Sequence, residues 1–263
     1  MNQEEIETSV SLICGKSIWA RKFIFRFQEV LSVRAWHVKR ELKKWLRTAP
    51  PQAHILDVGT GFGHFAYWLS CAKPEMSILA IDKLSDRICS GNSFVRELDR
   101  YNLLFKTQDV NELQVKEAFD LVLCIDVLEM IEKDEDAIRC MFNSLRPNGK
   151  ILLTVNRCLE KDMAKSRQGQ KRRGYTKAHI KEVLKEAGFN RVKFHYSGGP
   201  LGRTSQEIAV NIPLKALEVS RIFILFLPVY YLFVLPISAV LNWLDSKTAH
   251  GTGQGIILQA QRP

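Results

Sequence analysis

The stretch LDVGTGFG at positions 56–63 has glycine at every second position of its turn, Gly59, Gly61 and Gly63, where an apolar run passes into a helical pattern. Glycine allows positive φ angles and close approach of a ligand, and the first N–H groups of a helix are free to bind one. The dinucleotide pattern G-x-G-x-x-G would need its third glycine at position 64, which is His. The turn therefore predicts a ligand that need not bind through a phosphate.

Carboxylates follow the next two apolar runs. Asp82 ends the run SILAID, 25 residues after Asp57, and Asp109 follows a third run. A carboxylate at the end of the second strand of such a sheet can accept both hydroxyls of a ribose, and ligands of open α/β sheets bind at this carboxyl edge. A helix cap is the alternative role for Asp82. Together with the glycine turn, these residues predict a nucleoside site.

Seven short apolar segments, separated by helical periodicity or polar turns, must position these residues. The expected strands are residues 54–58, 77–82, 103–106, 119–131, 150–156, 191–197 and 255–261. One helix is expected to begin at about residue 64, and the other expected helices are residues 17–47, 86–101, 134–145 and 176–187. Strands that alternate with crossover helices lie parallel, so the expected fold is α/β, a doubly wound seven-stranded, mostly parallel sheet.

Three segments organise the chain. We expect residues 1–50 to form a basic amphipathic helical segment, which Pro50 and Pro51 end. Residues 51–199 and 255–263 would form the ligand-binding domain, with residues 157–174 as a polar loop. Residues 200–254 would be an apolar helical insertion before the last strand.

In this order and spacing, LDVGTGFG, LAID, the turn at Asp109, FDLVLCIDVLEMI, LRPNGKILLTV and YTKAHIKEVLKEAGF resemble the class I S-adenosylmethionine-dependent methyltransferases. The likeness is strongest to the small-molecule branch that includes quinone methyltransferases. It covers roughly residues 30–199 and the last strand. The resemblance implies a Rossmann-like methyltransferase fold and S-adenosylmethionine as the cofactor.

The resemblance also assigns residues to parts of the cofactor. Those expected around its methionine part are Asp57, Gly59, Thr60, Gly61 and Gly63. Those expected at the ribose and adenine are Asp82, Lys83, Asp109, Val110, Cys124 and Ile125. Two positions depart from the family pattern: Thr60 replaces the usual cysteine or serine, and Met130 replaces a common histidine.

Methyl transfer is a displacement at an already reactive sulfonium, so positioning supplies much of the acceleration and a base is needed only if the acceptor must lose a proton. CIDVLEM stands where amide and base N-methyltransferases carry (Asp/Asn)-Pro-Pro-(Tyr/Phe), which favours an oxygen or carbon acceptor. Glu129, Tyr175 and His64 are the candidate base or orienting residues. A cap, a buried hydroxyl and an ordinary turn residue are the respective alternatives.

The charge of the chain is uneven. Lys and Arg number 38 against 28 Asp and Glu, a net charge of +10. Residues 16–47 hold ten basic against two acidic side chains, and residues 157–193 hold twelve against four. Such blocks suit nucleic acid, anionic lipid or an acidic substrate, and a solvated helix face explains either block equally well.

Cysteine and histidine give no metal pattern. The six cysteines include no C-x-x-C pair and no zinc-like cluster, so they are interpreted as reduced thiols of a cytoplasmic chain and no metal site is predicted. His37, His179 and His195 are interpreted as packing or surface residues. The acidic start MNQEEIETSV shows no export signal.

Residues 222–241 form a run of twenty residues without a charge, long enough to span a membrane. The run stands between two strands of one sheet, so a single crossing is excluded. A second span is not expected, because residues 212–220 are short and contain Lys215 and Glu218. Pro228 and Pro236 are expected to interrupt the helix. The run is therefore predicted to be a re-entrant or interface-lying membrane element, with a hydrophobic lid or a subunit interface as alternatives.

The sequence thus favours a methyltransferase that acts on a hydrophobic, membrane-held small molecule such as a lipid, quinone or isoprenoid precursor. Residues 16–47 and 222–241 would attach it, as a peripheral or monotopic protein, to the cytoplasmic face of a membrane. An RNA or protein methyltransferase that uses the basic segments is the first alternative, but nucleic-acid binding does not explain the apolar run at residues 222–241. The second is a non-catalytic membrane scaffold that retains the cofactor pocket.

Overall fold

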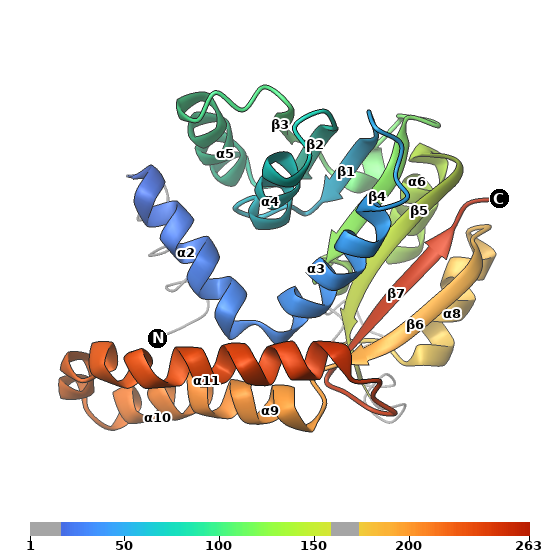
Figure 1. Ribbon diagram of the computed structural model, residues 1–263. Coiled ribbons are helices and arrows are strands. Elements are labelled where there is room, and N and C mark those ends of the chain that lie inside the picture. Colours follow the sequence, from blue (N-terminus) through green and yellow to red (C-terminus); the bar gives the residue numbers. More distant parts are fainter. Residues whose placement is uncertain (1–16, 159–173) are drawn as a thin grey trace. The chain divides into compact units, whose positions relative to one another are not determined.

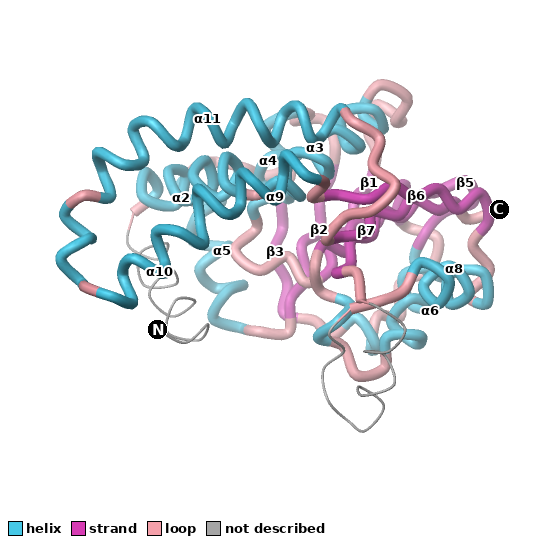
Figure 2. Tube along the Cα trace, turned by 90° about the horizontal axis from the view of Figure 1, so that it is seen from below, coloured by secondary structure: helices cyan, strands magenta, loops and turns pink. Residues whose placement is uncertain are grey.

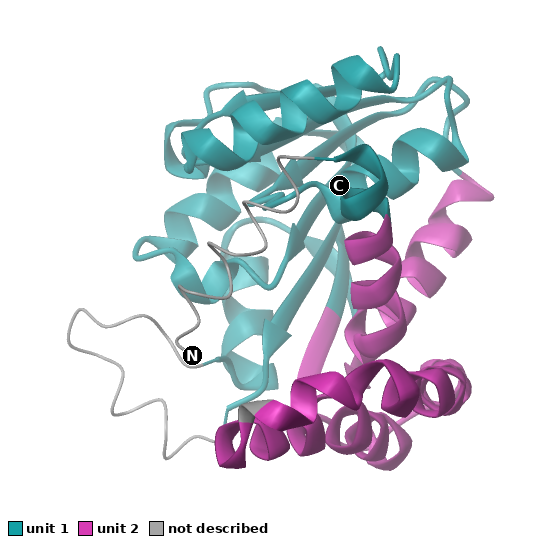
Figure 3. Ribbon diagram, turned by 90° about the vertical axis from the view of Figure 1, so that its left-hand side faces the viewer, with its two compact units in different colours: residues 1–22, 49–194, 258–263 teal, residues 23–48, 195–257 magenta. Residues whose placement is uncertain are grey.

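The computed structural model describes residues 17–158 and 174–263. The chain divides into two compact units (Figure 3). The first unit comprises the described residues of Met1–Lys22, Ala49–Phe194 and Leu258–Pro263, and the second comprises Phe23–Thr48 and His195–Ile257. Parts of the N-terminal segment and the insertion belong to the same unit.

The sheet has seven strands in the order β3-β2-β1-β4-β5-β7-β6 (Figure 1). Their bounds are β1 His54–Val58, β2 Ser77–Asp82, β3 Leu103–Thr107, β4 Phe119–Ile125, β5 Leu145–Asn156, β6 Asn190–Ser197 and β7 Gly255–Gln261. The sheet is mixed and mostly parallel, as expected: β3, β2, β1, β4 and β5 pair in parallel with their neighbours. The order reverses between β1 and β4, which is where such sheets bind ligands.

Helices of the first unit begin close to the expected residues. They are α4 His64–Ala72, α5 Ser85–Glu97, α6 Asp134–Ser144 and α8 Lys177–Glu186, with short 3₁₀ helices at Val110–Glu112 and Leu128–Met130. Thr176 caps α8, since its side chain accepts a hydrogen bond of 3.2 Å from the backbone N–H of His179. The central strands β1 and β4 are apolar and buried over most of their length, which makes them the rigid support of the carboxyl edge.

The helical region expected over residues 17–47 is two helices, α2 Ile18–Leu31 and α3 Val33–Leu46. The break is at Ser32, which has an extended backbone and accepts a hydrogen bond of 3.2 Å from the N–H of Ala35. Serine favours such a cap over the helix interior because its hydroxyl competes for backbone N–H groups. The hydrophobic periodicity continues through Ser32, which is why the sequence suggested one helix.

The insertion is a helical hairpin. Its first arm is α9 Pro200–Gln206, a π-helical segment Glu207–Asn211 and α10 Ile212–Val219, which follow one another directly (Figure 2). A 3₁₀ turn, Arg221–Leu225, leads into α11 Leu227–Lys247, which runs back along the first arm. The chain therefore returns to the same sheet, in which β7 lies beside β6. Among the described residues only α11 is long and apolar enough to cross a membrane, so the prediction that residues 222–241 have no second span beside them is confirmed, although residues 200–219 do form a second helical arm.

The two prolines have unequal effects on α11. Pro228 lies in the first turn, where its missing N–H would have no helical partner. Pro236 lies inside α11, which continues unbroken to Lys247. The expected interruption at Pro236 is therefore wrong. Side-chain hydrogen bonds between α11 and its neighbours on both sides of Pro236 hold the helix, and such tertiary contacts routinely override local propensity.

Candidate active site

The glycine turn after β1 has the backbone that only glycine adopts readily. Gly59, Gly61 and Gly63 have φ angles of 64°, 58° and 82°. A Cβ on Gly59 would collide with the side chain of Val127, which follows β4. A Cβ on Gly61 would meet, among the described residues, only Arg87 Nη1 at 4.0 Å. The turn is thus tightly packed at its start and open at Gly61, as a cradle for a ligand requires.

Three consecutive residues of this turn are each held by a charged side chain. Thr60 donates its hydroxyl to Asp57 at 2.6 Å, and the N–H of Gly61 donates to Asp82 at 3.0 Å. The carbonyl of Phe62 accepts a hydrogen bond of 2.5 Å from Arg21. Charge-assisted hydrogen bonds are stronger than neutral ones, so the turn is fixed in advance of binding.

Asp82 also has the capping role that the sequence left open. Its second oxygen accepts a hydrogen bond of 3.0 Å from the N–H of Leu84, the residue that precedes α5. Arg87 Nη1 lies 3.9 Å from the carboxylate. Because a carboxylate has about four acceptor positions, these contacts leave capacity for a ribose.

Asp57 is buried, and its burial raises its pKa to about 7, with a further increase from the charge of Asp82. The hydrogen bonds from Thr60 and from the backbone of Ala66 oppose this increase only in part. A cationic ligand beside Asp57 would favour the ionised carboxylate, which burial and the charge of Asp82 disfavour. S-adenosylmethionine carries a sulfonium and an ammonium group, so the residues present fit this cofactor.

The remaining expected cofactor residues lie at the carboxyl ends of β2, β3 and β4. Asp109 accepts a hydrogen bond of 2.9 Å from the N–H of Asn111 and so fixes the turn after β3, in which Val110 is buried. Cys124 is buried in β4, and its burial raises the pKa of its thiol, which stays neutral. Ile125 ends β4, and Lys83 is exposed beside Asp82.

The three candidate bases differ in their surroundings. Tyr175 is fully buried and donates to Asp134 at 2.5 Å, a contact that fits the buried-hydroxyl alternative. Glu129 is buried and accepts a hydrogen bond from the N–H of Asn156, at the end of β5. His64, at the start of α4, is half-buried against the ring of Phe65. Glu129 and His64 lie in segments that directly follow strands, and Tyr175 reaches the segment after β4 by a hydrogen bond of 3.4 Å to the carbonyl of Leu128.

Asp126, which directly follows β4, was not among the residues predicted from the sequence. Its φ of 59° is left-handed, a conformation that costs a non-glycine residue about 1 kcal/mol or more. Its carboxylate accepts a hydrogen bond of 2.7 Å from Thr154 on β5. Strained residues of this kind concentrate at functional sites, and Asp126 lies at the edge where the strand order reverses. An aspartate directly after a buried strand was the available signal.

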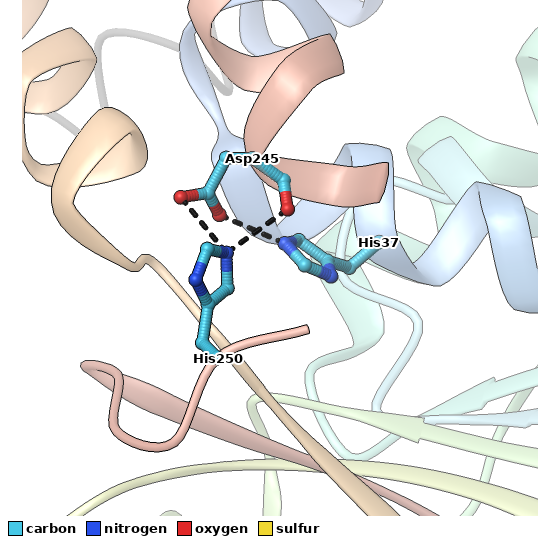
Figure 4. Close-up of side chains that lie close together, drawn as sticks. All are labelled: His37, Asp245 and His250. Atoms are coloured by element: carbon cyan, nitrogen blue, oxygen red, sulfur yellow. Dashed lines mark hydrogen bonds and ion pairs between the residues drawn. The ribbon is translucent and has the colours of Figure 1, made fainter. Parts of the chain in front are cut away.

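A second buried cluster lies in the second unit, where Asp245 stands between His37 and His250 (Figure 4). His37 Nε2 lies 2.9 Å from the Asp245 carboxylate, and His250 Nε2 lies 3.0 Å from the Asp245 carbonyl oxygen. The N–H of Gly202 donates to the same carboxylate at 2.9 Å. A nitrogen that faces a carbonyl must carry its proton, so this geometry is a hydrogen-bonded clamp and differs from a set of metal ligands.

The clamp fixes the base of the hairpin. It joins α3, the start of α9, the end of α11 and the segment before β7. Burial alone would raise the pKa of Asp245, but the hydrogen bonds from His37 and Gly202 outweigh it and hold that pKa below its ordinary value. His37, interpreted from the sequence as a packing or surface residue, is fully buried here.

The hairpin is polar inside and apolar outside. The buried side chains of α11 are Ser238, Asn242, Asp245 and Ser246, and those of the first arm include Gly202, Ser205 and Ala209. The exposed large apolar side chains of the hairpin before Val219 are Leu201, Ile212 and Leu214. Those from Val219 onward, which we call the apolar surface, are Val219, Ile222, Phe223, Ile224, Leu225, Phe226, Val229, Leu232, Phe233, Ile237, Val240, Trp243 and Leu244. Small and polar residues between helices, with apolar residues outward, are the pattern of helices packed in lipid.

Two tyrosines hold the arms together. Tyr230 and Tyr231 of α11 donate to the carbonyls of Ile208 and Ala209, the latter at 2.9 Å. Both carbonyls lie in the π-helical segment, where the wider turn displaces backbone groups from the α-helical pattern. Residues 227–247 are also long and apolar enough to cross a membrane by length and composition.

Comparison with known proteins gives consistent relatives. The family described as "Methyltransferase domain" matches residues 33–193, more than half of the chain. Ubiquinone biosynthesis O-methyltransferase of Rickettsia felis is 34% identical over 105 residues, which is 39% of this chain and 41% of that protein. The same enzyme of Rickettsia akari is 27% identical over 133 residues, 50% of this chain and 49% of that protein. The chain thus aligns with less than half the length of these relatives.

Solved structures share the fold. The [4+2]-cyclase SpnF has a TM-score of 0.59 and 21% identity, and covers 81% of this chain and 76% of its own. A putative sarcosine dimethylglycine methyltransferase from Galdieria sulphuraria has a TM-score of 0.59 and 13% identity, and covers 92% and 88%. At these identities the likeness concerns the fold alone. With the family match and the glycine turn at the carboxyl edge of a β3-β2-β1-β4-β5-β7-β6 sheet, we conclude that the chain belongs to the class I S-adenosylmethionine-dependent methyltransferases.

Proposed function

We propose that this protein transfers a methyl group from S-adenosylmethionine to an oxygen of a hydrophobic, membrane-held small molecule of the quinone-precursor class. The relatives named as ubiquinone biosynthesis O-methyltransferases support the acceptor class. The observation that carries the membrane location is the hairpin, whose polar side chains are inside and whose apolar surface is exposed.

The residues of the first unit would divide the work of binding the cofactor, which supplies a methyl group on a positively charged sulfur. The glycine turn and Asp57 would hold the charged methionine part, and Asp82 would accept the ribose hydroxyls. Asp109 and Val110 would face the adenine. Orientation then supplies most of the acceleration. Reactive groups that are already held in line lose no further translational freedom in the reaction, which lowers the activation barrier by several kcal/mol.

Proton removal from the acceptor hydroxyl is the step that needs a side chain. Glu129, His64 and Asp126 are the candidates, because each lies in a turn or helix start at the carboxyl edge of the sheet. Glu129 is already held by the N–H of Asn156, so it would act from a fixed position. The base would accept the proton as the methyl group is transferred, so it need not be strong enough to hold a free phenolate beforehand.

Membrane attachment would use the apolar surface. A large apolar side chain that leaves water contributes about 1.5–3 kcal/mol, so burial of only four of these side chains contributes about 6–12 kcal/mol. Exposed cations of the second unit, Arg26, Lys43, Lys44 and Arg47, would add about 1 kcal/mol each near anionic lipid. Because β6 and β7 flank the hairpin, attachment leaves the sheet on one side of the membrane, which fits a monotopic protein on a cytoplasmic face.

The cofactor half of the proposal is tested by calorimetry with S-adenosylhomocysteine. The purified full chain should bind it with micromolar or tighter affinity. Cells with and without the protein should differ, by mass spectrometry of lipid extracts, in an isoprenoid or quinone species separated by one methyl group. Cofactor binding without any lipid-soluble methylated product would refute the acceptor class.

The membrane half is tested by sedimentation with vesicles of phosphatidylglycerol and phosphatidylcholine. The protein should pellet with them at low salt. If it stays in the supernatant and forms a dimer in gel filtration, the apolar surface is a subunit interface and the membrane proposal is wrong.

A further inference from the structure

Helix α2 presents opposite chemistry on its two faces. Arg21 is fully buried, with 0% of its surface exposed. Trp19 and Phe23, on the other face, are 81% and 69% exposed, and Arg26 is exposed beside them. Lys22 Nζ lies 5.7 Å from the centre of the Trp19 ring. A buried arginine on a helix with exposed aromatic residues is unusual, because arginine is rarely buried without specific partners.

The partners of Arg21 belong to the first unit, as Arg21 itself does. Nη1 donates to the carbonyl and the hydroxyl of Ser90 on α5, at 2.7 and 3.0 Å. Nη2 donates at 2.5 Å to the carbonyl of Phe62, and the guanidinium carbon lies 4.5 Å from the centre of the Phe94 ring. Only the rigid fork of a guanidinium can reach both backbone carbonyls at once, so lysine cannot replace it.

Phe62 lies between Gly61 and Gly63 in the cofactor turn. Asp57 and Asp82 hold the two preceding residues of this turn, so Arg21 supplies the third fixed point. The first two points come from the strands. The third comes from a separate helix, so the turn is fully fixed only when α2 is in place.

We propose that Arg21 is a positioning residue that makes α2 a lid on the cofactor turn, and that docking of the outer face of this lid on an anionic lipid surface strengthens cofactor binding. The inference rests on the proposed function and adds a mode of regulation to it. Aromatic residues one helical turn apart, with Lys22 and Arg26 between and beside them, suit the boundary between headgroups and acyl chains.

The coupling must act in both directions. If lipid holds α2 in the position that fixes Phe62, bound cofactor must raise the affinity for lipid by the same factor. Arg21 is the described contact that joins α2 to the turn itself. Removing its guanidinium should therefore weaken cofactor binding and abolish the effect of lipid, while the carboxylates remain in place.

The first experiment measures S-adenosylhomocysteine binding to the full-length Arg21→Gln variant by calorimetry. A hydrogen bond to a charged group contributes about 1.5–3 kcal/mol, so we expect about a tenfold or larger increase in Kd. Arg26→Gln, which removes an exposed charge from the same helix, should change Kd by less than about twofold. The Kd of Arg21→Lys should lie between those of the other two variants, because an ammonium group can keep a hydrogen bond to one of the acceptors. An unchanged Kd for Arg21→Gln overturns the proposal.

The second experiment repeats the titration with vesicles of phosphatidylglycerol and phosphatidylcholine, and with phosphatidylcholine alone. Anionic vesicles should lower the Kd of the wild type severalfold and leave that of Arg21→Gln unchanged. Equal effects on both proteins overturn the coupling, as does the absence of an effect on the wild type.

Hydrogen exchange without any ligand separates this inference from the proposed function. In Arg21→Gln, amides in residues 18–24 and 60–63 should exchange at least several times faster than in Arg26→Gln, with the exchange of β1 and β4 unchanged. This result would support the lid even if the wild type failed to bind S-adenosylhomocysteine, which would refute only the proposed function. Equal exchange in both variants would overturn the lid.

Discussion

The cofactor edge of the first unit and the hairpin of the second arrange polar groups in opposite ways. At the cofactor edge, Asp57, Asp82 and Arg21 are buried around a turn that rests on apolar strands. In the hairpin, serine, asparagine and aspartate lie between the helices, and phenylalanine, leucine and isoleucine face outward. The first region gathers charge to bind a small polar ligand, whereas the second shields polar groups from its surroundings.

This difference bears on the proposed membrane attachment. A helix that packs in water buries its apolar stripe, because the hydrophobic effect drives it. The hairpin exposes many large apolar side chains instead, and its internal hydrogen bonds would contribute most where no water competes. One chain therefore contains two regions whose stability should respond differently to lipid, pH and mutation.

The largest expected effect concerns the tip of the hairpin. The triple variant Phe223→Ser, Leu225→Ser and Phe226→Ser should bind vesicles at least about a thousandfold more weakly, since each apolar side chain contributes about 1.5–3 kcal/mol when it leaves water. Cosedimentation measures this loss, and S-adenosylhomocysteine binding in solution should be unchanged. Serine at Leu104 and Tyr101, exposed in the first unit, is the matched control. If the triple variant still pelleted with vesicles, the hairpin would not be the region that binds lipid.

At the cofactor edge, Asp82→Ala should weaken S-adenosylhomocysteine binding about a hundredfold or more. It removes the acceptor for Gly61 and the expected ribose contact together, at about 1.5–3 kcal/mol each. Calorimetry measures the change. Asp86→Ala, an exposed carboxylate in the first turn of α5, should bind normally. Comparable losses in both variants would mean that general charge, and not the geometry of Asp82, governs binding.

The two units should also have opposite pH dependence. Folded Asp57 keeps its proton up to about pH 7, whereas its ordinary pKa is 3.8, so the first unit loses stability as pH rises between these values. Folded His195 stays neutral down to about pH 4, chiefly because it is buried, against an ordinary pKa of 6.5, so the second unit loses stability as pH falls through this interval. Each effect is at most about 3–4 kcal/mol.

Native-state hydrogen exchange between pH 4 and 7, corrected for intrinsic rates, can follow each unit separately. Asp57→Asn should remove the pH dependence of stability in the first unit only. His195→Gln should remove it in the second unit only. If either substitution removed it in both, the units would not be energetically separate.

The buried clamp should contribute less than the charged cofactor edge. Asp245→Asn should lower the free energy of unfolding of the second unit by about 2 kcal/mol, because it removes the negative charge that His37 and Gly202 face. Hydrogen exchange in α9 and the end of α11 measures this. The wild type should show no loss of stability with a chelator, and such a loss would identify the clamp as a metal site.

The smallest effect is expected inside the hairpin. Tyr231→Phe removes one hydrogen bond to Ala209 and should destabilise the two arms by about 1 kcal/mol in water. In vesicles the effect should grow, because the freed carbonyl has no water to bind. Exchange rates of residues 207–211 with and without vesicles provide the measurement. An effect that shrinks in lipid would argue that the hairpin works in water.

Local sequence patterns were enough to predict the sheet and the glycine turn that follows its first strand. Strands β1 and β2 end at the expected residues, and α4 begins at His64, because glycine, proline and apolar runs act over a few neighbouring positions. The prediction that the strand after the insertion belongs to the same sheet is confirmed, since β7 lies between β5 and β6.

What could not be predicted depends on contacts between distant residues. Arg21 belongs to a basic helical segment and reads as a solvated charge, yet it contacts Phe62, 41 positions away. Pro236 should end a helix by local rules, but hydrogen bonds from Tyr231 and Asn242 hold α11 on both sides of it. The apolar run does not reveal the helical arm beside it, because that arm carries charged residues such as Lys215, which pairs with Glu207 at 3.1 Å.

The two ends of the hairpin lie against each other, since a Cβ on Gly199, just before α9, would collide with the ring of His250, just after α11. An insertion whose ends adjoin behaves as a module, which evolution or an engineer can exchange without changing the strand order of its host. Joining residue 199 to residue 251 through a short loop should leave a water-soluble enzyme core. If residues 200–250 are inserted at the same place in another enzyme with this sheet, that enzyme should bind membranes.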